Sequence, residues 1–144
     1  MDNVVLDTSA WFALAESEPG ADEVEAYVAA AWLGRASLHS SFVSLTELQY
    51  IRTNEQGAES AAALVAWVKQ QPVQWLHSDE ALCGEAAKLK AGHKVSFADA
   101  FVAATAKRCD AVLVHKDPEF NALAGIIQLH PLPPKSGTGE TVKT

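Results

Sequence analysis

The sequence predicts an α/β fold of three layers, in which a central, mostly parallel sheet of four to five strands lies between helices. Short apolar runs alternate along the chain with helical segments of ten or more residues, which is the pattern of consecutive βαβ units. Helices that connect parallel strands cover both faces of the sheet. The 144 residues, of which 49% are hydrophobic, suffice for one domain with its own core.

The expected strands are short apolar runs, several of them rich in β-branched residues, that end at turn residues or at the start of a helix. The first ends at Asp7, and a carboxylate, Asp117, also follows the fourth. In chain order the strands are expected in "NVVL", "ASLHS", "VQWLH", "CDAVLVHKD" and "GIIQLHPLP".

The expected helices are segments whose apolar residues recur at helical spacing. Pro72 ends one of them, and Ser78 and Gly92 are expected to cap and to stop the next. In chain order, the first helix begins near Ser9 and the second after "EPG", the third is "FVSLTELQYIRTN" and the fourth spans 58–69. The fifth is "DEALCGEAAKLKA", and the sixth follows Ser96 in "SFADAFVAATA".

One domain is expected over residues 1–130. Residues 131–144, "PLPPKSGTGETVKT", are dominated by Pro, Gly, Ser and Thr, and we expect them to be a disordered tail. Apolar runs such as "AAALVAWV" are far shorter than the ~20 residues of a membrane span, so a cytoplasmic protein without membrane contact is expected. Cys83 and Cys109 have no CxxC spacing, and we interpret both as buried thiols.

The formal net charge of −7 disfavours a nonspecific binder of polyanions, because phosphate contacts require clustered Lys and Arg. Basic residues nevertheless flank the segment around Asp99. They either create a local field that accepts phosphate or belong to an ordinary solvated surface. These residues are Lys88, Lys90, Lys94, Lys107, Arg108 and Lys116.

Four carboxylates, Asp7, Glu47, Asp99 and Asp117, carry the functional interpretation, although each has a local alternative. Asp7 follows a strand and could simply cap the next helix. The other three lie in patterns that are typical of helix starts, where a side chain satisfies free backbone amides. These patterns are Ser44 with Glu47, Ser96 with Asp99, and Asp117 with Pro118.

Taken together, the four carboxylates indicate a metal site. Asp7 and Asp117 follow the carboxyl ends of strands, where ligands bind in open parallel sheets, and Glu47 and Asp99 lie near helix starts at the same edge. Such a cluster cannot remain fully ionised without a cation, because like charges raise one another's pKa. Oxygen ligands favour Mg²⁺ or Mn²⁺, which keep coordination positions for a phosphate oxygen and a water.

Four segments that contain these acids resemble, in order and spacing, the acidic motifs of PIN-domain ribonucleases, in particular VapC-type toxins. They are "VVLDTSAWFAL", "SFVSLTELQYI", "SFADAFVAATA" and "AVLVHKDPEF", and the resemblance covers residues 3–130. The resemblance implies that Asp7, Glu47, Asp99 and Asp117 are catalytic. It also implies that Asp7, Asp99 and Asp117 bind Mg²⁺ or Mn²⁺, with Asp7 and Asp99 as the principal ligands.

The resemblance implies an endoribonuclease that hydrolyses RNA phosphodiester bonds as the toxin of a toxin-antitoxin pair. A small VapB-like antitoxin is then the expected partner, and a homodimer is the expected assembly. Four Trp residues, with Trp11, Trp32 and Trp67 on helices, also suggest more aromatic surface than one small core hides. The alternative is a degenerate PIN-like module that binds metal or RNA without cleaving it.

Four further residues, Thr8, Ser9, Ser96 and His115, are candidates for supporting the ligands or positioning the phosphate. His115 departs from the family pattern, which usually has Thr or Ser two residues before the last acid. It could donate a hydrogen bond as a neutral side chain, contact the scissile phosphate, or simply face solvent at a strand end.

Overall fold

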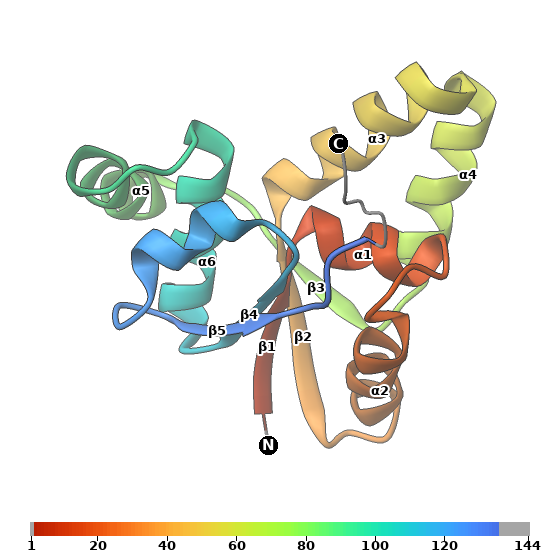
Figure 1. The fold of residues 1–144 in the computed structure, drawn as a ribbon, viewed down its shortest axis with the longest axis horizontal. Helices are drawn as coiled ribbons and strands as arrows, with labels where there is room; N and C mark the ends of the chain where they lie inside the picture. The colour runs from red at the N-terminus through yellow and green to blue at the C-terminus, as the bar shows by residue number, and fades with distance from the viewer. Residues whose placement is uncertain (1, 136–144) are drawn as a thin grey trace.

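The computed structural model describes residues 2–135, which form a five-stranded parallel sheet with helices on both faces (Figure 1). The strand order is β3-β2-β1-β4-β5, and every neighbouring pair is parallel. The strands are β1 (Asp2–Leu6), β2 (Ala36–Ser41), β3 (Val73–Leu76), β4 (Val112–His115) and β5 (Gln128–Pro131). The α/β class and the three layers that the sequence predicts are therefore confirmed.

The helices form two layers because side chains alternate across the central strand: Val5 packs against α5 and α6, while Val4 and Leu6 pack on the opposite side. The first layer contains α1 (Thr8–Ala15), α2 (Ala21–Trp32), α3 (Phe42–Gln56) and α4 (Ala58–Lys69). The second contains α5 (Glu80–Gly92), α6 (Phe97–Cys109) and the short 3₁₀ helix η1 (Pro118–Leu123). Among the described residues, no helix is long and apolar enough to cross a membrane.

The strand order places a topological switch point between β1 and β4. From β1 the chain proceeds to β2 and β3 on one side, and β4 and β5 then lie on the other side of β1. In open parallel sheets, ligands bind beyond the carboxyl ends of the strands at this point. Asp7 directly follows β1, and Asp117 lies two residues after the end of β4, so the fold places both at the switch point.

Three of the four Trp residues form one cluster on the face covered by α1 to α4. Trp11 is fully buried, and its ring lies 6.3 Å from that of Trp67 and 6.4 Å from that of Trp75. Trp32, at the end of α2, is 63% exposed. The expectation of surplus aromatic surface is therefore wrong for Trp11, whereas Trp67 is only partly buried against this core and Trp32 is exposed.

A hydrogen-bonded Ser40 anchors this cluster to the sheet, which gives a prediction about stability. The Trp11 indole Nε1 donates to Ser40 Oγ at 2.8 Å, and this hydroxyl donates to the Leu6 carbonyl at 2.7 Å. Ser40→Ala is expected to reduce the free energy of unfolding by about 1–3 kcal/mol, because a buried donor and a buried acceptor lose their partner. Urea unfolding measures this loss. Ser78→Ala, at an exposed position, is the control, and an equal loss in both variants would contradict the prediction.

The chain after β5 remains against the domain as far as Lys135. Leu132 is buried, and its amide donates to the His115 carbonyl at 2.7 Å, while Lys135 Nζ lies 3.2 Å from Glu18 Oε2. The expected domain boundary at residue 130 thus falls inside β5. The disorder expected for residues 131–144 is wrong for residues 131–135, which lie against the domain. Residues 136–144 lie outside the described residues.

Two local expectations are wrong. Asp79, and not Ser78, is the N-cap of α5, because its Oδ1 accepts a hydrogen bond from the Leu82 amide at 2.8 Å. The two thiols are not buried in the core: Cys83 is exposed, and Cys109 is half-buried at the end of α6.

Candidate active site

All four predicted acids line one crevice at the carboxyl end of the sheet, with a volume of about 230 Å³. They come from four different segments: the end of β1, the helix α3, the first turn of α6 and the start of η1. The crevice is lined by Asp7, Thr8, Ser9, Phe12, Glu47, Ile51, Asp99 and Asp117. The structure therefore brings these carboxylates together, and their catalytic role remains a prediction.

Asp7 is both a helix cap and a crevice residue. Its Oδ2 accepts hydrogen bonds from the Ser9 amide at 3.2 Å and the Ser9 hydroxyl at 2.5 Å, so the local alternative is correct for this residue. The side chain is only 4% exposed, and this burial is the main reason why its pKa rises to about 6. The hydrogen bonds from Ser9 oppose that rise, and the charge of Glu47 adds to it.

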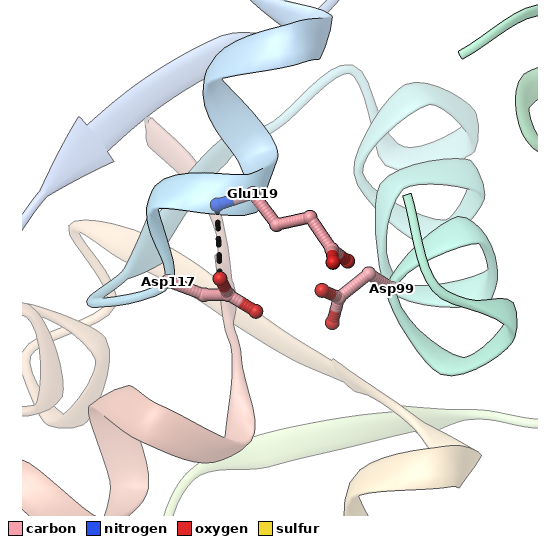
Figure 2. A group of neighbouring side chains, drawn as sticks. All are labelled: Asp99, Asp117 and Glu119. Atoms are coloured by element: carbon pink, nitrogen blue, oxygen red, sulfur yellow. Dashed lines mark hydrogen bonds between the residues drawn. The ribbon is translucent and has the colours of Figure 1, made fainter. Parts of the chain in front are cut away.

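Asp99 lies in the first turn of α6, where only half of the predicted capping pattern is present. The Ser96 hydroxyl accepts from the Asp99 amide at 3.1 Å, as a cap does. The Ser96 amide, however, donates to Glu119 Oε1 at 2.7 Å. The carboxyl group of Asp99 points toward Asp117 and Glu119 instead (Figure 2). The interpretation of its side chain as a cap is therefore wrong.

The environment of Asp99 strongly favours its protonated form when no cation is bound. Burial, to 7% exposure, is the largest cause, followed by hydrogen bonds with the carboxyl groups of Asp117 and Glu119. The negative charges of Asp7 and Asp117 act in the same direction, and the pKa rises to about 9. At neutral pH the cluster of Asp99, Asp117 and Glu119 therefore favours retaining a proton when no cation is bound.

Glu119 belongs to this cluster, although the sequence interpretation did not include it. One carboxylate oxygen from each of Asp99, Asp117 and Glu119 lies within 4.8 Å of the others (Figure 2). Asp117 is the N-cap of η1, and its Oδ1 accepts from the Glu119 amide at 2.9 Å. The signal was present in "DPEF": an acid two residues after a helix-capping acid lies on the same short turn.

Glu47 projects into the crevice from α3 and is held by Thr8. The cap of α3 is Ser41, which precedes the expected Ser44, so Glu47 is not part of a capping box. Its Oε1 lies 2.6 Å from Thr8 Oγ1, which in turn lies 2.8 Å from Ser44 Oγ. Because a carboxylate only accepts, Thr8 donates its hydroxyl proton to Glu47.

The PIN domain family matches residues 4–126 of this sequence. The chain belongs to the PIN domain family. The resemblance drawn from the four acidic segments is thus confirmed at the level of the family.

Solved structures with the same fold are toxin-antitoxin proteins. Rickettsia felis VapBC2 bound to a promoter DNA fragment has a TM-score of 0.72 at 15% identity, over 91% of this chain and 99% of that one. Mycobacterium tuberculosis VapC20, a toxin that cleaves the sarcin-ricin loop, has a TM-score of 0.67 at 22% identity, over 89% and 99%. DNA-bound VapBC from Salmonella typhimurium has a TM-score of 0.71 at 21% identity, over 91% and 98%. No curated protein matches the sequence.

Ser9 connects two strand ends of this PIN domain. Its hydroxyl donates to Asp7 and accepts from the Lys116 amide at 2.9 Å, so it fixes the Asp7 carboxylate relative to the segment that carries Asp117. Ser96 has a comparable local role as the cap of α6.

His115 is buried at the end of β4, so the expectation that it could face solvent is wrong. Its side chain is 1% exposed, and its ring packs edge-on against Phe120 at a centroid distance of 5.0 Å. Neither ring nitrogen has a hydrogen-bond partner among the described residues. Burial lowers the pKa of the imidazole, so His115 is neutral at pH 7. It does not line the acidic crevice.

Most of the basic residues around Asp99 already have partners, which favours the interpretation as an ordinary surface. Arg108 binds Asp79 through two hydrogen bonds of 2.9 Å, which are the main reason why the pKa of Asp79 falls to about 2. The ammonium of Lys90 donates to the Val95 carbonyl at 2.8 Å. Three further ion pairs involve residues of this group: Lys107 with Glu85 at 3.2 Å, Lys88 with Glu85 at 3.9 Å, and Lys116 with Glu18 at 3.1 Å.

Proposed function

We propose that this PIN domain is an endoribonuclease that hydrolyses RNA phosphodiester bonds with the help of Mg²⁺ or Mn²⁺. The convergence of Asp7, Glu47, Asp99 and Asp117 in one crevice is the observation that supports this function most strongly. The raised pKa of Asp99 indicates more negative charge than the ion-free crevice tolerates. A divalent cation relieves this repulsion, and a donor set made only of oxygen suits Mg²⁺ and Mn²⁺.

Asp7, Asp99 and Asp117 would hold the cation, with Asp7 and Asp99 as the principal ligands. When bound, such an ion polarises a phosphoryl oxygen and lowers the pKa of a water molecule. Ser9 orients Asp7 through its two hydrogen bonds, and Thr8 orients Glu47 at the rim of the crevice. Both carboxylates line the crevice, and these hydrogen bonds would hold them there, facing the space in which we propose that the phosphate binds.

We further propose that the protein acts in the cytoplasm as the toxin of a toxin-antitoxin pair and that a VapB-like antitoxin is its partner. Solved VapBC complexes with the same fold support this assignment. The negative crevice also suits inhibition by an Arg side chain from the partner, since a guanidinium binds two carboxylate oxygens at once. A homodimer remains part of the proposal, and its aromatic support comes from the exposed Trp32 and the partly buried Trp67.

Incubating the purified protein with total RNA tests the proposed activity. Cleavage is expected with Mg²⁺ or Mn²⁺ and is expected to stop with excess EDTA, because the carboxylates alone do not polarise the phosphate. A gel resolves the products, and a shift assay on the same samples detects binding. Equal cleavage in EDTA would contradict metal dependence, whereas binding without cleavage under every condition would favour the degenerate module.

A further inference from the structure

The start of α6 carries a capping box that is completed from a different segment of the chain. In a capping box, the N-cap side chain accepts a hydrogen bond from the backbone amide three residues later. The side chain of that later residue accepts in return from the backbone amide of the N-cap. In α6, Ser96 accepts from the Asp99 amide at 3.1 Å. The reciprocal bond does not come from Asp99: the Ser96 amide donates to Glu119 Oε1 at 2.7 Å.

This exchange of partners leaves the Asp99 carboxyl group available to the crevice. Asp is one methylene shorter than the Glu or Gln that usually completes the box. Glu119 replaces it from η1, where its own amide donates to Asp117 Oδ1 at 2.9 Å. The Glu119 carboxylate thus binds the N-cap of the helix that carries Asp99. The Glu119 backbone amide binds the carboxylate of Asp117 (Figure 2).

We propose that Glu119 is a positioning residue: its carboxylate completes the capping box of α6 and thereby holds Asp99 in the crevice at a fixed distance from Asp117. This role concerns the proposed nuclease site. Only the cleavage measurement below depends on the nuclease function being correct. Without the bond from Ser96, the first turn of α6 is linked to η1 only through the carboxyl contacts of Asp99 with Asp117 and Glu119. The backbone that carries Asp99 then no longer fixes its distance from Asp117.

Two substitutions separate positioning from charge. Glu119→Gln and Glu119→Ala both remove the negative charge, but only Gln keeps an oxygen at the same reach for the Ser96 amide. We expect Glu119→Gln to cleave RNA within about threefold of the parent. We expect Glu119→Ala to lose about tenfold or more, mainly in kcat, because a small displacement of a ligand impairs the chemical step. Glu25→Ala, at an exposed position of α2, is the matched control.

Hydrogen exchange at the Ser96 amide provides a measurement that does not depend on activity. Slow exchange is expected in the parent and in Glu119→Gln, and faster exchange in Glu119→Ala. An equal loss of cleavage in both variants, accompanied by equal weakening of Mn²⁺ binding in calorimetry, would make Glu119 a metal ligand and overturn the proposal. Unchanged exchange in all variants would also overturn it. A parent that fails to cleave RNA would contradict the nuclease function, and the exchange data would still decide the role of Glu119.

Discussion

Replacing Asp99 with Asn is expected to reduce RNA cleavage by about a thousandfold or more while the fold remains intact. Asn has nearly the same shape as Asp but lacks the charge that would bind the cation. The cap of α6 is unaffected, because Ser96 accepts from the backbone amide of residue 99 and not from its side chain. Initial rates on a labelled RNA at saturating Mg²⁺, together with far-ultraviolet circular dichroism, measure both parts of this prediction.

Asp22→Asn serves as the control for the loss of one negative charge, since Asp22 is an exposed residue in the first turn of α2. It is expected to cleave at the parental rate. If Asp99→Asn cleaved RNA as well as the parent, the buried carboxyl group at the start of α6 would have only a structural role. The proposed metal site would then lose its central ligand.

The sequence was sufficient to predict the parallel sheet and its acidic edge, because both depend on local patterns. Apolar runs followed by acids identified the ends of β1 and β4, and strands separated by helices are almost always parallel. Asp7 and Asp117 could therefore be placed at one edge without knowledge of the strand order. The order itself depends on contacts between distant segments, which a local pattern does not encode.

Residues whose role arises from contacts between segments could not be predicted. Glu119 completes the cap of a helix whose N-cap, Ser96, lies 23 positions earlier in the chain, so no local motif contains both partners. Similarly, Thr8 holds Glu47 across 39 positions. The burial of Trp11 was misjudged for the same reason, since composition does not reveal that the rings of Trp67 and Trp75 pack against it.

The second large effect concerns stability: above pH 6.5, where the lowered pKa values of His39 and His115 no longer act in the opposite direction, the protein without a cation is expected to become less stable as the pH rises to about 9. The ordinary pKa of an Asp side chain is 3.8, whereas the folded protein raises that of Asp7 to about 6 and that of Asp99 to about 9. Within this range the folded protein holds protons that the unfolded chain has released. The contribution of Asp7 and Asp99 to the free energy of unfolding is therefore fully present below pH 3.8. It is lost as the pH rises through their pKa values in the folded protein, about 6 and about 9. For each such proton, the free energy of unfolding falls by at most about 1.4 kcal/mol per pH unit.

A divalent cation is expected to reverse this dependence, because ligand carboxylates must release their protons to bind it. Calorimetric unfolding between pH 6.5 and pH 8.5, in EDTA and in Mg²⁺, measures both curves. Stabilisation by Mg²⁺ should increase with pH, because an ion that binds only the folded state raises the melting temperature.

Asp99→Asn should melt at a higher temperature than the parent in EDTA at pH 8 and respond less to Mg²⁺, since no proton or charge remains at that position. Stability in EDTA that is constant or rises across this range would mean that the folded protein tolerates the ionised carboxylates. The electrostatic reason for a cation at this crevice would then be lost.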